Sequence, residues 1–289
     1  MSAFKSILVP VSDAESGSAP LESALHLAGR FGSHVTGLHV RVDPTTAVPL
    51  VGEGMSGAMV EEMINMAESQ GTQRAKAART AFDALCSRHG APIRTDPGPG
   101  LSAEWVDQVG REEDVVAWRG RLSDLVVLGH PRGESEMPAL MTLNSALLGS
   151  GKPLLLCPPE PPAQFGRSVA IAWNGSAEAS RAVGWAMPLL REAAAVTILA
   201  VSEHSDSTVD APASELLAYL AWNGVTATVT TSQASNTHAG EELLRQTQKS
   251  GADLLVMGAY THSRLRQLIL GGVTRHVLSH APMHCLMCH

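Results

Sequence analysis

The sequence predicts two successive α/β domains, each a doubly wound, five-stranded and mainly parallel sheet with helices on both faces. Two observations predict this fold class. The chain has 289 residues, about twice the length of an ordinary domain. Strand and helix patterns also alternate in the same order twice along it. Because parallel neighbours need crossover connections, such alternation favours parallel sheets covered by helices.

Three strand patterns of the first half recur in the second half. Each is a short run of aliphatic or β-branched residues, with the length of a buried parallel strand. The corresponding pairs are 6–11 and 168–173, 34–40 and 195–201, and 123–129 and 252–258. An Ala-rich amphipathic helix follows each opening strand, at 16–31 and 177–191. Each half closes on a last strand, at 153–157 and 284–288.

The middles of the two halves differ. The first half is predicted to hold a Gly-, Pro- and Val-rich excursion at 41–57, a helix at 58–89, a strand at 103–109 and a helix at 112–119. The second half is predicted to hold a helix at 214–223, a strand at 226–231 and a helix at 239–249. The Pro-rich tract 158–162 cannot continue a helix, so we place the domains at 1–159 and 166–289. A lid, a partner contact and disorder all stay open for the excursion.

Composition excludes several classes of partner. The formal net charge is −7 and no run of five Lys or Arg occurs, which argues against nucleic-acid binding. The apolar stretch 7–11 is too short for a signal sequence, and no run approaches the ~20 apolar residues that span a membrane. Four cysteines are too few for a secreted disulfide framework. We therefore expect a cytoplasmic protein.

Common enzyme signatures are missing from the sequence. Neither opening strand is followed by Gly-x-Gly-x-x-Gly, and no Walker A motif, Gly-x-Ser-x-Gly elbow or His-Glu-x-x-His occurs. Dehydrogenase, P-loop and common hydrolase functions therefore lack support.

Two other patterns favour structural roles. Cys285 and Cys288 lie among histidines in a run that suggests soft metal ligands, but on a strand they would face opposite sides. We therefore favour a strand there. Methionines 55, 59, 63 and 66 follow helical spacing, which predicts a packed helix face.

The loops after the first and fourth strands are where a doubly wound sheet binds ligands. In the second half these loops are 173–176 and 258–274. Gly258, Gly271 and Gly272 have no side chain to keep an anion away from the backbone N–H groups. Free N–H groups bind anions in this way at the N-terminus of a helix. A phosphate cradle and a pair of ordinary loops are both open readings of this pattern.

The stretch from 253–258 through 271–278 to 285–288 resembles the universal stress protein family, and the resemblance covers almost the whole chain in two copies. That family has an adenine nucleotide alpha hydrolase-like fold. Members that bind ATP carry Gly, two residues, Gly, nine residues, Gly, and then Ser or Thr. This chain keeps Gly258 and Gly271 but has Thr261 at the second glycine and Gly272 at the hydroxyl position.

The resemblance implies that the C-terminal domain binds ATP or another adenine nucleotide, with Mg²⁺ as an optional companion. It implies no catalytic residue and at most slow hydrolysis. Asn174 stands where the family usually has Asp, and Val201 ends the second strand on the adenosine side. The residues expected at the nucleotide are Ala172, Trp173, Asn174, Val201, Met257, Gly258, Thr261, His262, Gly271, Gly272, Val273 and Thr274.

The departures from the family pattern have physical consequences. If the second glycine position needs a positive φ, a β-branched Thr261 is disfavoured there. Asn174 keeps an acceptor but loses the negative charge. In the first half Ser12 stands at the acid position with Asp13 displaced by one, and Pro131 removes an N–H donor. We therefore expect a degenerate nucleotide site there.

The resemblance also implies that the two domains pack through their last strands as an intramolecular pseudo-dimer, with a homodimer as a further option. The favoured function is a stress-response regulatory protein that binds an adenine nucleotide in its C-terminal domain. A nucleotide-free protein-interaction module on the same fold is the main alternative. A binder of another small molecule or a metal is the third.

Overall fold

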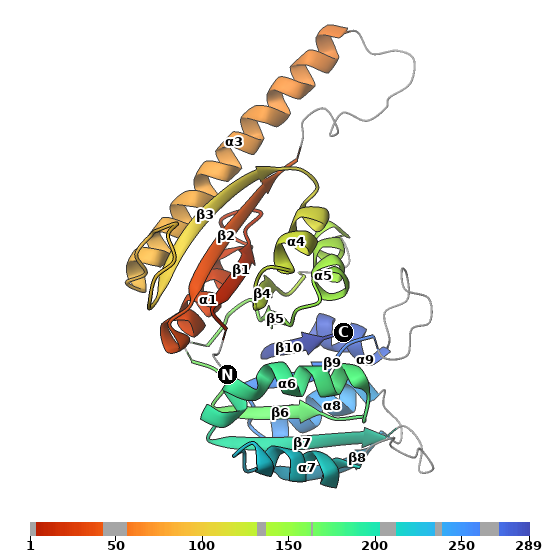
Figure 1. The fold of residues 1–289 in the computed structure, drawn as a ribbon. Helices are drawn as coiled ribbons and strands as arrows, with labels where there is room; N and C mark the ends of the chain where they lie inside the picture. Colours follow the sequence, from red (N-terminus) through yellow and green to blue (C-terminus); the bar gives the residue numbers. More distant parts are fainter. Residues whose placement is uncertain are drawn as a thin grey trace. The chain divides into compact units, whose positions relative to one another are not determined.

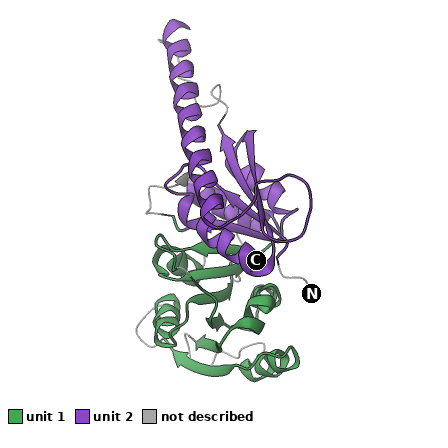
Figure 2. Ribbon diagram, turned by 90° about the vertical axis from the view of Figure 1, so that its left-hand side faces the viewer, with its two compact units in different colours: residues 1–3, 130–137, 151–289 green, residues 4–129, 138–150 purple. Residues whose placement is uncertain are grey.

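The computed structural model describes residues 4–42, 57–131, 137–162, 164–202, 212–234, 239–260 and 272–289. They form two compact units (Figure 2). The N-terminal unit comprises residues 4–129 and 138–150, and the C-terminal unit comprises mainly residues 151–289 together with 130–137. The domain boundaries expected at 159 and 166 stay a prediction.

The N-terminal unit contains a parallel sheet in the order β3-β2-β1-β4 (Figure 1). Its strands are β1 (Ser6–Pro10), β2 (His34–Arg41), β3 (Ser102–Val109) and β4 (Leu125–Gly129). Its helices are α1 (Ser18–Phe31), α3 (Gly57–Arg88), α4 (Glu112–Gly120) and α5 (Met137–Gly149). The first strand therefore lies between the second and the fourth.

The C-terminal unit repeats this arrangement, with the strand order β5-β10-β9-β6-β7-β8. Its strands are β5 (Leu154–Cys157), β6 (Ser168–Ala172), β7 (Ala195–Ser202), β8 (Thr228–Gln233), β9 (Leu254–Gly258) and β10 (His284–Cys288). Its helices are α6 (Ala177–Glu192), α7 (Ala213–Trp222), α8 (Ala239–Lys249) and α9 (Gly272–His280). All pairs are parallel except β5 with β10, which are antiparallel.

The structure confirms the internal repeat. One aspartate in each copy makes the same contact, between the start of the fourth strand and the start of the first. Asp124 precedes β4 and accepts hydrogen bonds from the backbone N–H groups of Lys5 and Ser6 at 2.7 and 3.0 Å. Asp253 precedes β9 and accepts from the N–H groups of Gly166 and Ser168 at 2.7 and 3.3 Å. Each carboxylate thus ties the start of the fourth strand to the start of the first.

Strand β5 pairs with strand β10 within the C-terminal unit. Leu286 of β10 lies opposite Leu155 of β5, and both strands are fully buried. Their apolar side chains stabilise the C-terminal unit by leaving water. The helix α5 is not among the elements expected from the sequence.

Helix α3 differs from its expected packing. Its buried residues all lie at or after Ala78, and the ring of Phe82 fills the space beside Gly37 of β2. A Cβ at Gly37 would lie 2.7 Å from that ring, so only glycine admits it. Met59, Met63 and Met66 are 53%, 41% and 55% exposed. The prediction of a packed methionine face is therefore wrong within the described chain.

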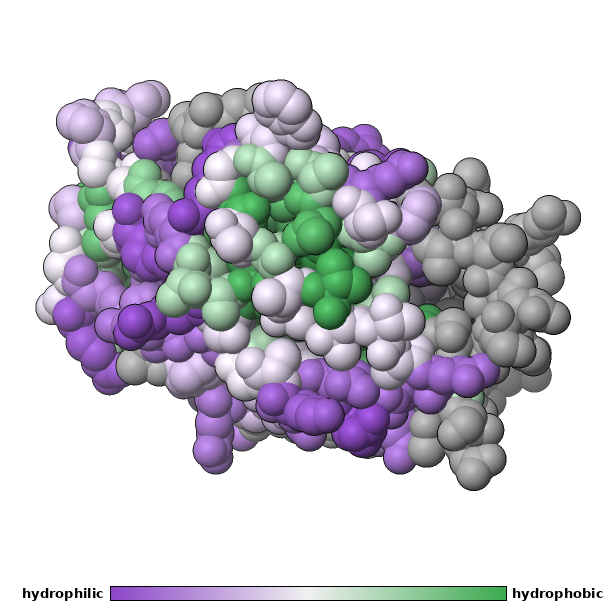
Figure 3. Space-filling view, turned by 90° about the horizontal axis from the view of Figure 1, so that it is seen from below, coloured by the Kyte–Doolittle hydropathy of each residue, from purple (hydrophilic) through white to green (hydrophobic). Residues whose placement is uncertain are grey.

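Strand β8 is an edge strand among the described residues, and no charged side chain lies on it. β3, at the same place in the other sheet, carries Glu104 and Asp107. Beside β8, α7 exposes Tyr219 and Trp222, the latter by 91%. Figure 3 looks at this end of the molecule and shows apolar side chains gathered at the centre of the face.

None of the helices in the described part of the chain combines the length and apolarity needed to cross a bilayer.

Candidate functional site

The strand order of the C-terminal unit reverses between β6 and β9. From β6 the chain adds β7 and β8 on one side, and then β9 and β10 on the other. A reversal of strand order is where doubly wound sheets form a ligand crevice. The paired ends of β6 and β9, at which the two loops singled out by the sequence begin, therefore lie side by side.

The ends of three strands meet at this edge. Ala172 of β6 lies beside Leu199 of β7 and Met257 of β9. The Trp173 N–H donates a hydrogen bond to the Leu199 carbonyl at 2.9 Å, and the indole side chain is buried. β7 continues past this point, so half-buried Val201 flanks the 173–176 loop. The expected adenosine-side residues thus share one edge of the sheet.

The loop after β6 is built around Asn174. Its Oδ1 accepts hydrogen bonds from the Ser176 N–H at 3.2 Å and from the Ser176 Oγ at 2.8 Å. Gly175 between them has a φ of 77°, which glycine adopts without strain. Ser176 in turn caps α6 by accepting from the Ala179 N–H at 3.2 Å. The side-chain oxygen of Asn174 was expected to contact the ligand. In the structure the same oxygen orders the loop by binding Ser176.

Gly258 holds β9 close to the first turn of α6. A Cβ at this position would lie 2.5 Å from the Ala179 nitrogen and 2.8 Å from the Glu178 carbonyl carbon. Backbone atoms cannot yield as a side-chain tip can, so only glycine fits. Gly258 is thus required for the packing of a helix on a strand, in addition to any approach of a phosphate.

Tyr260 is the residue with backbone strain in this region. Its φ is 63°, in the left-handed region that non-glycine residues rarely occupy. Its N–H donates a hydrogen bond to the Thr274 Oγ1 at 3.3 Å, and both side chains are buried. Burial also raises the pKa of the Tyr260 phenol. This contact holds the first turn of α9 beside the end of β9.

Part of the expected phosphate loop lies outside the described residues. Thr261, His262 and Gly271 belong to the stretch 261–271, which the structure does not describe. Gly272 is the exposed first residue of α9, Val273 is half-buried, and Thr274 is buried. Among the described residues α9 begins at Gly272, and its contact with a phosphate stays a prediction.

An ion pair contributes charge beside Gly258. Glu178 is half-buried in the first turn of α6, and its Oε1 lies 2.9 Å from the Arg181 guanidinium. Arg181 also donates a hydrogen bond to the His289 carbonyl at 2.9 Å. The pair adds a carboxylate and a guanidinium close to the crevice, with little net charge.

The equivalent crevice of the N-terminal unit holds a carboxylate. The Ser12 hydroxyl lies 3.0 and 2.9 Å from the two carboxylate oxygens of Glu112, and Thr142 also donates to Glu112. Burial raises the pKa of Glu112, against the effect of these hydrogen bonds. The carboxylate form of Glu112 would oppose phosphate binding at this place, and the degenerate site of the first half stays a prediction.

The displaced acid of the first half has a structural role. Asp13 Oδ1 accepts hydrogen bonds from the N–H groups of Glu15 and Ser16 at 2.9 and 2.8 Å. This turn resembles the one that Asn174 makes, shifted by one residue along the chain.

The C-terminal cysteines lie on a buried strand, as predicted. Cys285 and Cys288 belong to β10, and both thiols are free. Burial raises the pKa of both thiols, for Cys288 to about 12. Among the described residues, no three His, Cys, Asp or Glu side chains gather closely enough to hold a metal ion.

Three residues at or near the two crevices were not predicted from the sequence: Tyr260, Glu178 and Glu112. A positive φ at tyrosine has no sequence signature, because the signal for such a turn is normally glycine or asparagine. Glu178 and Glu112 occupy first turns of helices, where acidic residues are common for reasons unrelated to ligands.

The comparisons with known proteins agree with this fold. Residues 167–289 match the model of the Universal stress protein family. No curated protein matches the chain significantly in sequence.

Solved structures resemble the chain over nearly its full length. A universal stress protein from Archaeoglobus fulgidus DSM 4304 has a TM-score of 0.69 at 16% identity, covering 98% of this chain and 95% of its own. A putative universal stress protein from Pseudomonas aeruginosa UCBPP-PA14 has a TM-score of 0.57 at 16% identity, covering 99% and 93%. A functionally unknown protein from Pseudomonas aeruginosa PAO1 has a TM-score of 0.55 at 15% identity, covering 99% and 92%.

These matches span both halves, so the tandem α/β architecture is that of solved universal stress protein folds. Residues 167–289 are therefore similar to the universal stress protein family, and the chain as a whole shares the fold of solved structures that carry that name.

Proposed function

We propose that the protein is a stress-response regulatory protein whose C-terminal unit binds one adenine nucleotide in the crevice between β6 and β9. The observation that carries the proposal is the convergence of the Asn174 loop, Gly258 and the N-terminus of α9 at the point where strand order reverses. Backbone N–H groups at such a helix N-terminus favour a phosphate.

Each side of the crevice would take a different part of the nucleotide. Ala172, Trp173 and Val201 offer an apolar wall for the adenine. The amide of Asn174 would face the ribose, and Gly272 with Thr274 would face the phosphates. Thr274 accepts from Tyr260, so its own hydroxyl hydrogen is available for a phosphate oxygen. Thr261, His262 and Gly271 stay in the proposal on the strength of the family pattern.

Magnesium would be held mainly by the phosphates. The nearby side-chain oxygens belong to Asn174, Glu178 and Thr274, of a type that Mg²⁺ prefers. However, Asn174 Oδ1 is engaged by Ser176, and Glu178 is engaged by Arg181. The ion is therefore an optional companion and not a requirement.

Native mass spectrometry of the purified chain tests the proposal, followed by calorimetric titration with ATP, ADP and AMP. We expect one adenine nucleotide per chain. Gly271→Val should abolish binding while the circular dichroism spectrum stays unchanged. Two nucleotides per chain would contradict a degenerate N-terminal site, and an empty protein that ignores added nucleotide would contradict the proposal itself.

A nucleotide-free interaction module is the second candidate. The observation that favours it is the saturation of the Asn174 acceptor by Ser176 inside the loop. An empty protein in the same titration would support this alternative.

A further inference from the structure

The side chain of His289 contacts the turn that leaves β9. Its Nδ1 lies 3.1 Å from the carbonyl oxygen of Ala259. Because a carbonyl only accepts, the Nδ1–H donates this hydrogen bond. The His289 ring also meets the Tyr260 ring edge-on, with 6.2 Å between the centroids and an angle of 74° between the planes. His289 itself is exposed, so it touches the turn from the surface of the C-terminal unit.

The peptide unit between Ala259 and Tyr260 is held at both of its polar ends. Its carbonyl accepts from His289, and its N–H donates to the Thr274 Oγ1 at 3.3 Å. A rotation of this peptide would therefore break both hydrogen bonds together. The preceding N–H, of Ala259, donates to the Cys288 carbonyl at 2.8 Å, so the sheet fixes the start of the turn.

This orientation of the peptide is a strained one for Tyr260. Its φ of 63° lies in the left-handed region, and such a conformation persists only where the surroundings over-determine it. A flip of the peptide would return φ to the ordinary negative region and would turn the N–H away from Thr274. The hydrogen bonds to His289 and Thr274 therefore select the strained state.

Arg181 fixes the main chain of His289. Its Nε donates to the His289 carbonyl at 2.9 Å, and its guanidinium pairs with Glu178 Oε1 at 2.9 Å. Glu178 lies in the first turn of α6, and Thr274 lies near the start of α9. A continuous series of polar contacts thus runs from one helix N-terminus of the candidate crevice to the other, and His289 is its central member.

The equivalent turn of the first copy lacks this arrangement. The main-chain N–H after β4 donates to the last carbonyl of β5 at 2.9 Å, just as the N–H after β9 donates to the last carbonyl of β10 at 2.8 Å. The residues around this shared bond differ. Pro158, which has no side-chain donor, stands where the second copy has His289. Pro131, whose ring fixes φ at about −65°, stands where the second copy has Tyr260.

We propose that His289 is a positioning residue of the candidate nucleotide site. By holding the Ala259–Tyr260 peptide, it keeps the Tyr260 N–H on the Thr274 oxygen, and the Thr274 hydroxyl hydrogen stays available for a phosphate oxygen. A site ordered in advance binds its ligand without the cost of ordering the turn. The inference rests on the proposed nucleotide function.

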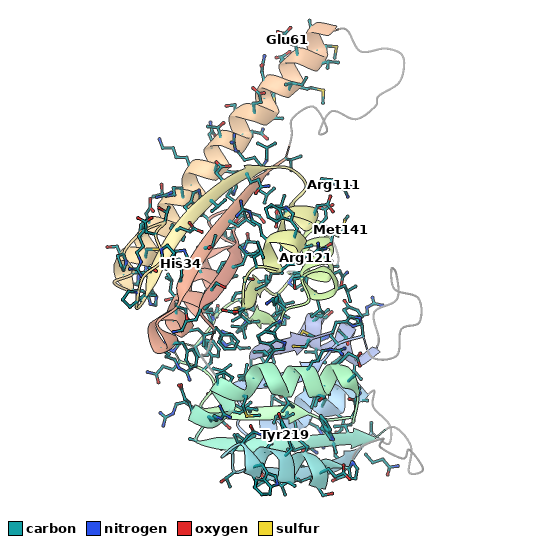
Figure 4. The ribbon with its side chains drawn as sticks, in the orientation of Figure 1. His34, Glu61, Arg111, Arg121, Met141 and Tyr219 are labelled. Carbon is teal, nitrogen blue, oxygen red and sulfur yellow. The ribbon has the colours of Figure 1, made fainter. Side chains whose placement is uncertain are left out.

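The two tyrosines of the chain provide a readout in the ligand-free protein. Isotope-labelled tyrosine gives one amide signal for Tyr260 and one for Tyr219, which lies on α7 and is labelled in Figure 4. We expect His289→Ala to speed hydrogen exchange of the Tyr260 amide at least about tenfold and to leave the Tyr219 amide unchanged. Thr274→Val should have the same effect. The double variant should add little, because both contacts hold one peptide.

Two further substitutions separate the hydrogen bond from the ring contact. His289→Asn keeps an N–H donor close to the position of Nδ1, so the Tyr260 amide should exchange as slowly as in the wild type. His289→Phe keeps a ring beside Tyr260 without the donor, so it should behave like His289→Ala. His280→Ala, which removes another exposed histidine at the end of α9, is the matched control. Unchanged circular dichroism will show that the variants fold.

Calorimetric titration with ATP, ADP and AMP tests the effect on the site. His289→Ala and His289→Phe should weaken binding about fivefold, the amount expected for one lost hydrogen bond. His289→Asn and His280→Ala should stay within about twofold of the wild type. A role of His289 in ring packing alone would give the reverse order for the Asn and Phe variants.

The two readouts distinguish the possible failures. Unchanged Tyr260 exchange in His289→Ala, or a Phe variant that matches the wild type, would overturn the inference. Faster exchange with unchanged nucleotide affinity would also overturn it, and would leave the proposed function intact. A wild-type chain that binds none of the three nucleotides would overturn the proposed function and the positioning role together, while the exchange data would still show whether His289 holds the peptide.

Discussion

Asn174 organises its loop without a ligand. Two hydrogen bonds from Ser176 converge on its Oδ1, and Ser176 then caps α6. The residue therefore links the packing of the helix to the shape of the candidate crevice. An acidic residue at this position would keep the same acceptor geometry and add the charge that the family usually has there.

Asn174→Asp should leave the stability of the fold unchanged and tighten nucleotide binding about fivefold, because a charged acceptor adds ~1 kcal/mol to a ribose hydrogen bond. Asn174→Ala should weaken binding and lower the free energy of unfolding by about 1 kcal/mol. Titration calorimetry and urea unfolding measure the two effects. Ser12→Ala, at the matching position of the N-terminal unit, is the control and should not alter nucleotide affinity. Weaker binding by the Asp variant would argue against a ribose contact.

The structure gives packing roles to two residues that sequence reasoning assigned to ligand binding. Gly258 was expected to approach a phosphate, and the structure shows that it must also admit the backbone of α6. Asn174 was expected to face a ligand, and its acceptor binds Ser176. These contacts involve atoms of α6 or of the turn that leads into it. The spacing of residues in a motif does not predict which atoms will pack against it. The positive φ of Tyr260 is likewise a product of tertiary contacts.

At the scale of elements, the contact between β9 and α6 depends on a missing Cβ. Gly258→Ala would place a methyl group 2.5 Å from the Ala179 nitrogen. We expect a loss of about 1–3 kcal/mol in the free energy of unfolding, because the helix must shift. Gly184→Ala, within α6 and with no atom within 4 Å of the added Cβ, is the matched control. It should gain up to about 1 kcal/mol.

Urea unfolding followed by circular dichroism compares these two glycine variants. Equal stabilities would mean that β9 and α6 are less closely packed than the structure indicates. A large loss in both would point to a general intolerance of the unit to substitution.

Strands and helices were predictable because their apolar periodicities are short and occur twice. β10 was predicted with its observed bounds, 284–288, and α8 likewise at 239–249. The exception is α5, whose sequence MPALMTLNSALLG has too few polar residues to show a helical stripe. The methionines of α3 show another limit, because a periodic pattern defines a face but does not identify what covers it.

Over the whole molecule, acidification is expected to act in opposite directions on two buried groups, His130 and Glu112, one in each unit. In the C-terminal unit, burial lowers the pKa of His130 from 6.5 to about 4, while its Nδ1–H donates to the Leu278 carbonyl at 3.1 Å. The neutral imidazole is therefore favoured by folding. In the N-terminal unit, burial raises the pKa of Glu112, so folding favours its protonated form.

The signs follow from linkage. The stability that depends on neutral His130 is fully present above pH 6.5 and is lost as the pH falls toward 4, at most ~3 kcal/mol. Protonation of Glu112 instead stabilises its unit as the pH falls through the raised pKa. His130→Asn should weaken the pH dependence of stability in the C-terminal unit. Glu112→Gln should weaken the pH dependence of stability in the N-terminal unit. Hydrogen exchange resolved by peptide, corrected for the intrinsic rate at each pH, compares each variant with the wild type. A variant whose unit keeps the wild-type pH dependence would contradict the assignment for that residue.

The bare edge of β8 has a practical consequence for handling the protein. β3 carries two carboxylates that repel an incoming strand, whereas β8 offers threonine, valine, serine and glutamine with no charge. In concentrated stocks held for long periods, insoluble material should therefore nucleate on the C-terminal unit. Any nucleus formed there would recruit further chains by strand addition, so shelf life would depend on this edge.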